Sequence, residues 1–507
     1  MCGFIFQLSQ RAKCADDFGR ALERISWRGP DAQRIVRYNQ GKVLLGHCRL
    51  AVVDLSDDAN QPMESVCGRY AIVFNGEIYN HDFIRKKLNL KCKTKSDTET
   101  ILEGYSLVGD DIFSLLDGMF SLVIYNRATG QWTAARDAFG IKPLFMWRKN
   151  QEIIFSSEAS VVASLAGAIP CPIALAEWRV IRRPLPGASF FQGVEEVTPG
   201  QVVKSSGETF FHWKWAAANE SFEQSAFEER VRRSVDLHGM SHVENVSLLS
   251  GGLDSAIVVS LAGTSAAYSV GLEYNNEFEG AQETADLVGA SLKKVSVSED
   301  ELVSTWKYLT RLRGEPLSLP NEGLIYNVCR KMTPQQKVVL TGEGADEICF
   351  GYDQIFRWAS GLNELDTHAF LDLYGYSADC RSERLESFVD LLKRGKSPIE
   401  FVEDFFLLVH LPCLLRRMDF ASMAASKEAR VPFVSKSLIG YCYRQPSSLK
   451  INSLESKLPI RKFAERLGLS GALQRKKIGF SAQFTSNASR KESYRSFQDI
   501  VLGELKW

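Results

Sequence analysis

Two loops in the second half of the chain contain residues that could bind a nucleotide. Segment 250–255, Ser-Gly-Gly-Leu-Asp-Ser, follows the apolar run 243–249 and precedes a helix-like run. Gly251 and Gly252 allow a tight turn, and successive N–H groups with the Ser250 and Ser255 hydroxyls form an anion site suited to pyrophosphate. No Gly-Lys-Ser/Thr follows, so this is not a Walker A loop. A simple strand-to-helix turn capped by Ser250 is the structural alternative.

A second loop is acidic. Segment 341–347, Thr-Gly-Glu-Gly-Ala-Asp-Glu, follows another apolar strand, 338–340, and Asp254 supplies a carboxylate within the first loop. The carboxyl ends of parallel strands lie at one edge of a sheet, so the two loops could meet at a single crevice. The alternative for 341–347 is a solvated acidic turn.

Cys2 becomes the first residue once Met1 is removed, as a small second residue permits. An N-terminal cysteine carries an α-amine beside its thiol, so nucleophile and base can belong to one residue. A cysteine at position two is uninformative alone, and its surroundings decide its interpretation.

The elements that must position these groups fall into two patterns. Up to about residue 205 the chain predicts short strands, for example 2–8, 42–55, 70–74, 119–125 and 131–136, interrupted by two helices, after Asn80 and at 97–108. From Ser221 isolated apolar strands alternate with helices, which is typical of a parallel α/β sheet, and the tail beyond Asp366 is largely helical. We therefore expect a domain at 1–205, a linker at 206–220 and a second domain at 221–507.

Composition excludes several classes of partner. The 507 residues hold 61 Lys+Arg and 61 Asp+Glu, so no overall field favours nucleic acid or an anionic membrane. The N-terminus lacks the pattern of a signal peptide, and the longest apolar run, 401–415, is too short and too charged to span a bilayer. The 11 cysteines contain no Cys-x-x-Cys and fit reduced thiols in the cytoplasm.

Seven motifs in one order carry a family resemblance. They are CGF at the start, RGPD at 28–31, HCRLAVVDL at 47–55, NGEIYN at 75–80, SDTE at 96–99, SGGLDS at 250–255 and GEGADE at 342–347. The chain resembles glutamine-hydrolysing asparagine synthetases, which join a class II glutamine amidotransferase to a PP-loop ATP pyrophosphatase. The resemblance implies an α+β and α/β chain: an N-terminal αββα sandwich of the Ntn-hydrolase type, then a parallel-sheet α/β PP-loop domain with a helical C-terminal part.

The resemblance assigns roles in the first half. Cys2 would attack the glutamine side-chain amide, and Asn75 with the Gly76 N–H would form the oxyanion hole. Arg49 would bind the glutamine α-carboxylate, and Glu77 and Asp97 its α-amine. Taken singly, Arg49, Asn75-Gly76 and Asp97 fit a strand-edge cation, a hairpin turn and a helix N-cap better than a site, whereas together these interpretations would have to coincide.

The resemblance also assigns the second half to the use of ATP and Mg²⁺ to adenylate a carboxylate. Glu343 would orient or deprotonate the incoming amine, and Lys477 would stabilise charge near the acyl-adenylate. Asp254 and Asp346 would hold Mg²⁺, which prefers a few carboxylates plus phosphate oxygens. The remaining positions matched to the ATP and pyrophosphate site are Leu249, Ser250, Gly251, Gly252, Asp254, Ser255, Val270 and Gly342, and Lys457 and Arg461 match a looser motif.

Departures from the family pattern concern the acceptor. Ser435 stands where asparagine synthetases carry aspartate, Trp27 replaces a histidine, and Asn276-Glu277-Phe278 resembles a segment of β-lactam and carbapenam synthetases. Those cyclases carry a tyrosine at the position of Glu343 and characteristically lack a working glutaminase.

Three hypotheses follow from the motifs and these departures. The first is a glutamine-dependent synthetase of asparagine or of a related carboxylate, with glutamine, ATP and the acceptor acid as small-molecule substrates. The second is a β-lactam synthetase-like cyclase of a specialised or antibiotic pathway. The third is a degenerate scaffold, disfavoured by the two intact loops. Family members are often dimers.

Overall fold

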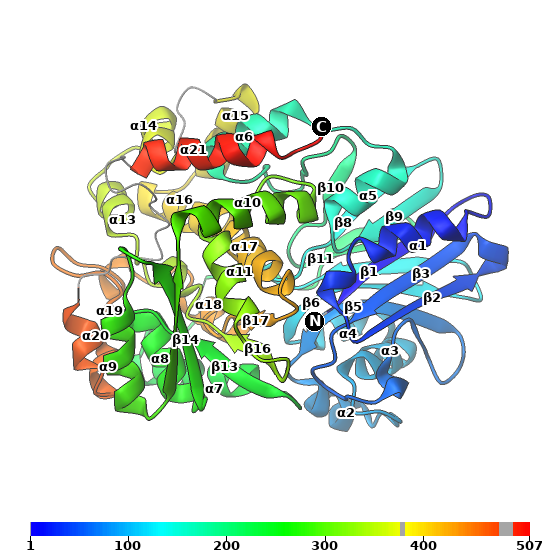
Figure 1. Ribbon diagram of the computed structural model, residues 1–507, viewed down its shortest axis with the longest axis horizontal. Coiled ribbons are helices and arrows are strands. Elements are labelled where there is room, and N and C mark those ends of the chain that lie inside the picture. Colours follow the sequence, from blue (N-terminus) through cyan, green and yellow to red (C-terminus); the bar gives the residue numbers. More distant parts are fainter. Residues whose placement is uncertain (1, 218, 376–380, 476–489) are drawn as a thin grey trace.

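In the computed structural model the first half of the chain forms two stacked antiparallel sheets (Figure 1). The structure describes residues 2–217, 219–375, 381–475 and 490–507. The first sheet has the order β10 (Val194–Glu196), β8 (Phe145–Lys149), β9 (Glu152–Ser156), β1 (Gly3–Leu8), β3 (Val43–Arg49) and β2 (Ala32–Tyr38). The second has the order β12 (Thr209–Phe211), β11 (Gln201–Lys204), β7 (Trp132–Arg136), β6 (Gly118–Asn126), β5 (Tyr70–Ile78) and β4 (Met63–Glu64).

Apolar side chains lie on both faces of β1, which shows why this strand is covered by the second sheet on one face and by a helix on the other. Phe4 and Phe6 point into the core between the two sheets, whereas Ile5 points outward beneath a helix that carries Phe18, as the two-residue period of a strand requires. Helices therefore cover both outer faces. They are α1 (Ala15–Glu23) and α5 (Ala159–Ala166) on one side, and α2 (His81–Leu88), α3 (Asp97–Val108) and α4 (Ile112–Leu115) on the other. The predicted αββα sandwich is confirmed.

Two details of the first half differ from the prediction. The expected strand 42–55 ends at Arg49, because the chain leaves the sheet there and turns through Asp54 at φ 54°. Only two helices were expected, whereas α1, α4, α5 and α6 (Pro172–Ile181) are also present; they are short, and α5 and α6 contain β-branched residues that favour strands. Strand β12 completes the second sheet beyond residue 205, and the domain boundaries stay a prediction.

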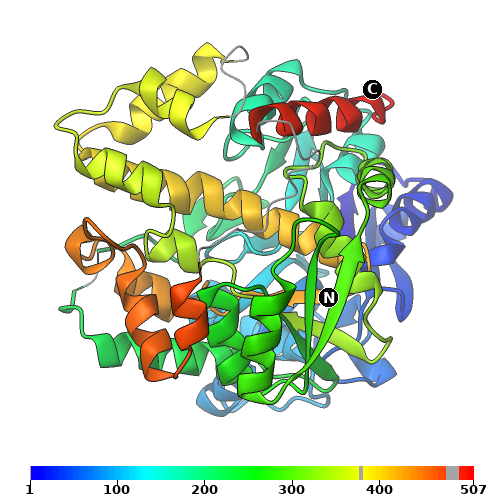
Figure 2. The same ribbon diagram turned by 60° about the vertical axis from the view of Figure 1, so that its left-hand side comes forward.

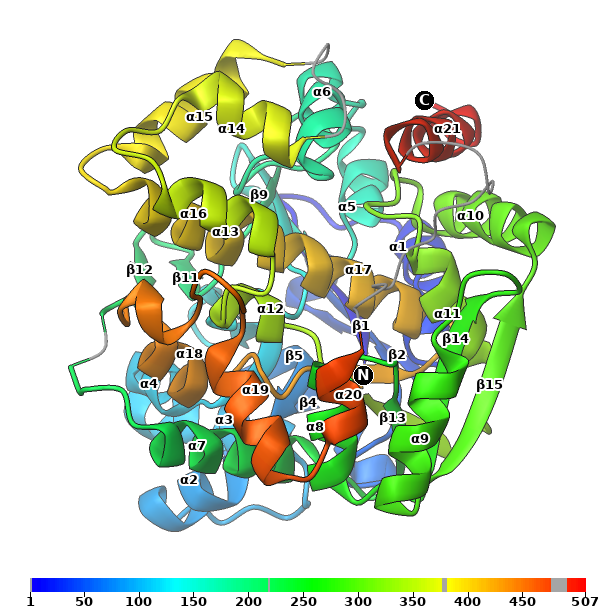
Figure 3. The same ribbon diagram turned by 90° about the vertical axis from the view of Figure 1, so that its left-hand side faces the viewer.

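The second half is built on a parallel five-stranded sheet, as predicted. Its order is β15 (Ser291–Val297), β14 (Ala266–Leu272), β13 (Glu244–Leu248), β16 (Gln336–Leu340) and β17 (Glu428–Arg430). One face packs against α7 (Gln224–His238), α8 (Leu253–Ala262), α9 (Phe278–Val288), α18 (Lys436–Cys442), α19 (Leu458–Arg466) and α20 (Ser470–Gln474), several of which stand in front of the sheet in Figure 3. On the other side lie α11 (Glu322–Arg330) and α17 (Leu411–Met423), with α10 (Glu299–Arg313) packed on α11 and α21 (Arg490–Gly503) packed on α10.

The remaining helices confirm a largely helical tail. They are α12 (Ala345–Ile348), α13 (Asp353–Ser360), α14 (Thr367–Tyr374), α15 (Glu383–Lys393) and α16 (Pro398–Phe405). A π-helical turn, Phe406–His410, joins α16 to α17, and Figure 2 shows the resulting long helix running to the middle of the molecule. Among the described residues, no helix is long and apolar enough to cross a membrane. The short strand β17 was missed by the sequence analysis.

Two apolar cores cross from one half to the other. Leu50, Tyr79, Met119 and Ile141 of the first half share a core with a group from the second half, among them Val431. In the other shared core, the indole of Trp178 on α6 donates a hydrogen bond to the Leu317 carbonyl at 2.8 Å. The two halves thus share buried apolar surface.

Candidate functional site

Cys2 lies at the start of β1, beside the strand that carries Asn75. The Cys2 N–H donates to Asn75 Oδ1 at 3.1 Å, and the Cys2 side chain is buried. Asn75 Nδ2 is also buried and has no hydrogen-bond partner in the part of the chain that the structure describes. An unpartnered donor beside a thiol is the arrangement that an oxyanion hole needs.

Gly76 follows Asn75 on β5. A Cβ at this position would lie 2.1 Å from the Met119 carbonyl oxygen of the paired strand β6. No side chain fits there, and the backbone of β5 can approach its neighbour only because residue 76 is glycine.

Burial and the neighbouring groups have opposite effects on the pKa of the Cys2 thiol. Burial raises the pKa of Cys2, whereas the Leu50 N–H and the charge of Arg49 lower it. On the other side, Arg28 Nε donates to the Cys2 carbonyl at 3.0 Å. The main chain of Cys2 is therefore held at both its N–H and its carbonyl, and its thiol is buried.

Arg49 is anchored by the loop that follows β3. Its Nη1 donates to the Ser56 carbonyl at 2.7 Å and to Asn60 Oδ1 at 2.8 Å, and its Nη2 donates to the Asp54 carbonyl. A guanidinium has five N–H groups, so two remain for a carboxylate ligand.

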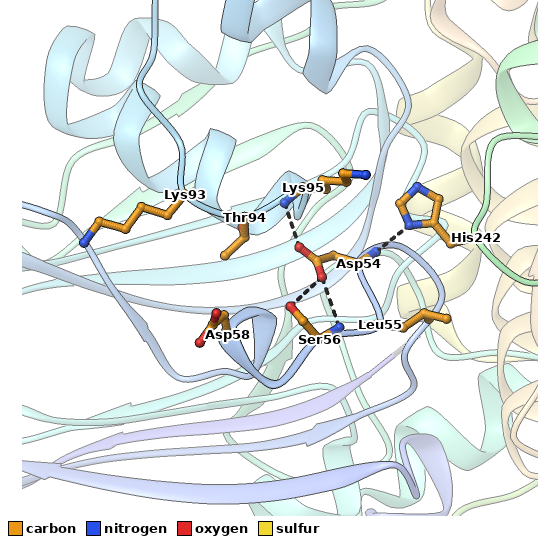
Figure 4. A pocket seen from close by; sticks show the side chains of 8 residues that line it. All are labelled: Asp54, Leu55, Ser56, Asp58, Lys93, Thr94, Lys95 and His242. Atoms are coloured by element: carbon orange, nitrogen blue, oxygen red, sulfur yellow. Dashed lines mark hydrogen bonds between the residues drawn. The ribbon is translucent and has the colours of Figure 1, made fainter.

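Residues of the loop that follows β3 also line one side of an open pocket of about 420 Å³ (Figure 4). The pocket is lined by Asp54, Leu55, Ser56, Asp58, Lys93, Thr94, Lys95 and His242. His242 comes from the second half, and its Nδ1 accepts a hydrogen bond from the Asp54 N–H at 3.1 Å. The second half thereby contacts the loop that anchors Arg49.

Two buried carboxylates, Glu77 and Asp97, flank Asn75. Asp97 begins α3 and accepts the Ile78 N–H at 2.9 Å, while Glu77 Oε2 lies 3.4 Å from an Nη atom of Arg430. Burial and the mutual repulsion of the pair raise the pKa of Glu77, and burial also raises the pKa of Asp97. Such a pair is suited to a cationic ligand, which would relieve both effects.

In the second half, the side chains of two serines hold the turn of the loop 250–255 by hydrogen bonds. Ser250 Oγ and Ser255 Oγ lie 2.9 Å apart, and the Gly252 N–H donates to Ser250 Oγ at 3.1 Å. The predicted ATP-site residues Leu249 and Val270 are both buried, at the end of β13 and within β14. The Leu249 N–H donates to the Tyr268 carbonyl at 2.8 Å, which ties the loop to β14.

The two loops do meet at one edge of the sheet, as predicted. A Cβ on Gly342 would lie 2.6 Å from the Ser255 nitrogen and 2.7 Å from the Asp254 carbonyl carbon. Gly251 is similarly close to Glu277, whose Cβ would lie 3.1 Å from a Cβ added at 251. The segment 276–278 that resembles the cyclases therefore begins α9 directly against this loop.

Asp254 and Asp346 face one another across this contact. Lys457 Nζ lies 2.7 Å from Asp346 Oδ1 and also binds Asp254 Oδ2, so one cation reaches both carboxylates. Asp254 Oδ1 is buried without a hydrogen-bond partner among the described residues. Within that part of the chain no cluster of three His, Cys, Asp or Glu residues could hold a metal. Mg²⁺ is commonly bound by one or two carboxylates together with phosphate oxygens, and this pair of carboxylates fits that pattern.

Glu343, in the acidic loop, contacts the buried helix α17. Its carboxylate pairs with Arg417 on α17, whose other Nη donates to Asn321 Oδ1 at 3.3 Å. Arg417 was missed by the sequence analysis, although an Arg-Arg pair within an apolar helical run is a signal that could have identified it. Lys477 lies outside the described residues, and its role stays a prediction.

Comparisons with known proteins agree with this division. A glutamine amidotransferase domain family matches residues 1–215 and the asparagine synthase family matches residues 226–505. Asparagine synthetase [glutamine-hydrolyzing] 1 of Bacillus subtilis is 27% identical over 95% of this chain and 87% of its own length. Asparagine synthetase of Triphysaria versicolor is 31% identical over 87% of this chain and 69% of its own length.

A solved structure of glutamine phosphoribosylpyrophosphate amidotransferase from B. subtilis has a TM-score of 0.33 and 12% identity, and covers 68% of this chain and 82% of that chain. The family matches span both halves of the molecule, and each coincides with one of the two sites described above. The chain belongs to the asparagine synthase family, with a glutamine amidotransferase domain at its N-terminal end.

Proposed function

We propose that this protein hydrolyses glutamine at Cys2 and uses the ammonia to amidate a carboxylate that has been adenylated with ATP. The observation that supports this most directly is the pair of prepared sites in one chain: Asn75 Nδ2 unpartnered beside Cys2, and Asp254 and Asp346 within reach of one cation. Asparagine is the product that the relatives' names suggest.

In the first half-reaction the Cys2 sulfur attacks the glutamine amide carbon. The negative charge that develops on the amide oxygen is received by Asn75 Nδ2 and the Gly76 N–H. The α-amine of Cys2, free once Met1 is removed, takes the thiol proton and passes it to the departing ammonia. Arg49 binds the α-carboxylate, and Glu77 and Asp97 bind the α-ammonium. Water then hydrolyses the thioester to glutamate.

In the second half-reaction the loop 250–255 binds the phosphates of ATP while an acceptor carboxylate displaces pyrophosphate. Asp254 and Asp346 would hold Mg²⁺, which neutralises phosphate charge when bound. Glu343, held by Arg417, orients the ammonia that attacks the acyl carbon, and AMP departs. Ammonia would pass between the sites beside the apolar core that the two halves share around Met119, Ile141 and Val431, which excludes water.

This function is tested by measuring pyrophosphate release over a panel of carboxylates, with glutamine, with ammonia and with neither. We expect a signal from aspartate or a related acid with either nitrogen source, and Cys2→Ala should lose the glutamine-driven signal alone. Product formation that needs no nitrogen source would instead indicate the cyclase reaction. Asp346→Ala should lose pyrophosphate release and keep glutaminase activity; normal release would refute the assignment of Mg²⁺.

A further inference from the structure

Arg430 of the second half reaches into the glutamine site of the first. It ends β17, the edge strand of the parallel sheet, where it pairs with Leu340 of β16. Its carbonyl accepts the Thr341 N–H at 3.0 Å, and its side chain is fully buried. The backbone of Arg430 is therefore fixed beside the acidic loop while its side chain extends toward the other half.

Five contacts hold the guanidinium in place. Nε donates to Glu428 Oε1 at 2.6 Å, and Nη1 donates to the carbonyls of His238 at 2.8 Å and Met240 at 2.5 Å. Nη2 points to Glu77 Oε2 at 3.4 Å, and the guanidinium carbon lies 5.7 Å from the centre of the Tyr79 ring. The planar group is thus oriented by its own half and offers one edge to Glu77.

The charges around Glu77 show what Arg430 contributes. Burial alone would raise the pKa of Glu428, but Arg430 holds it at about 2, so Glu428 is a carboxylate. Burial and the charge of Asp97 raise the pKa of Glu77, and Arg430 opposes this rise. Arg430 is therefore the neighbouring side chain that favours the ionised form of Glu77, against burial and the charges of Asp97 and Glu428.

Glu77 also has an unused acceptor. Its Oε1 is buried and has no hydrogen-bond partner within the described part of the chain. An ammonium group that donates to this oxygen would satisfy it, and would add positive charge where Glu77 and Glu428 share one guanidinium.

We propose that Arg430 is a positioning residue for glutamine, because its Nη2 holds Oε2 of Glu77 and leaves the unpartnered Oε1 to receive the α-ammonium of the substrate. The proposal rests on the proposed function in taking Glu77 as part of the glutamine site. It follows that the amidotransferase half is incomplete without the synthetase half, which supplies one of the charges that the glutamine site requires.

The test compares glutamine and ammonia as nitrogen sources in Arg430→Gln. We expect the KM for glutamine to rise about 30-fold or more, as for a buried charge pair that has lost one partner. The kcat for glutamine hydrolysis and the ammonia-driven rate should stay at the wild-type values. Arg430→Lys retains the charge and should recover part of the loss, whereas an unchanged KM would overturn the proposal.

Two further variants separate this role from a structural one. Arg430→Gln combined with Glu428→Gln removes the pair together, so it avoids an uncompensated buried carboxylate if the single variant folds poorly; it should show the same rise in KM. Arg183→Gln is the matched control, since Arg183 is buried and pairs with Glu196 at 2.5 Å away from these residues. An equal fall of glutamine- and ammonia-driven rates in the Arg430 variants would overturn the proposal, whereas a wild-type protein without glutaminase activity would refute the proposed function itself.

Discussion

At the scale of single residues, the side chain of Asn75 leads to a specific prediction. Its Oδ1 accepts the Cys2 N–H, whereas its Nδ2 has no hydrogen-bond partner among the described residues. A buried donor without a partner costs about 1–3 kcal/mol, which an arriving oxyanion would recover. Asn75→Ala should lower kcat for glutamine hydrolysis about 10²- to 10³-fold, with ammonia-driven pyrophosphate release retained. Glutamate release measures this. Asn75→Asp is the matched control of similar size that lacks the donor, and wild-type glutamate release in either variant would contradict the assignment.

Lys457 makes a second prediction at the same scale. Its ammonium group bridges Asp254 and Asp346, and its own side chain is buried. Lys457→Met should lower the free energy of unfolding by about 3 kcal/mol, because two partly buried carboxylates are left facing each other. Thermal unfolding with and without Mg²⁺ checks this. Mg²⁺ should stabilise the variant more than the wild type, and equal stabilisation of both would show that the metal does not bind these carboxylates.

At the scale of elements, the contact between the two nucleotide loops depends on Gly342. A methyl group there would overlap the backbone of residues 254 and 255, so Gly342→Ala must move one loop away from the other. We expect pyrophosphate release to be lost while glutaminase activity stays normal. Gly440→Ala in α18 is the control, because a Cβ at that position meets no atom within 4 Å. Normal pyrophosphate release in Gly342→Ala would show that the loops need not touch.

The same scale shows how far sequence could predict this molecule. Helix α3 matches its predicted bounds, and β13 differs from the predicted run 243–249 by one residue at each end, because this strand is an apolar run bounded by turn residues. The loop after Arg49 was mistaken for strand, because its apolar residues pack against the other half instead of a sheet neighbour. The contacts of Arg417 and Arg430 could not be predicted, since their partners lie 74 and 353 residues away in sequence. Motifs identify residues that act, whereas long-range packing decides which residues hold them.

At the scale of the whole molecule, one carboxylate on α17 joins the halves. Asp419 Oδ2 accepts from Arg28 at 2.8 Å and its Oδ1 accepts from Lys142 at 3.0 Å, with all three side chains buried. Arg28 is the residue that also binds the Cys2 carbonyl. Because α17 carries Arg417 two residues earlier, one helix contacts both candidate sites.

Asp419→Asn should therefore weaken the docking of the halves by about 3–5 kcal/mol, because Arg28 and Lys142 lose a buried partner. Burial would raise the pKa of Asp419, but Arg28 and Lys142 lower it below its ordinary value. A lowered folded-state pKa gives stability that is present above about pH 4 and is lost as pH falls through the folded-state pKa. The difference in unfolding temperature between wild type and variant should accordingly be largest near neutrality and shrink on acidification. The exposed Asp353→Asn is the control and should show no such difference. Asp419→Asn should also release more glutamate per molecule of amide product formed, if the halves are coupled through Asp419. A glutamate-to-product ratio equal to that of the wild type would show that α17 joins the halves without serving the transfer of ammonia.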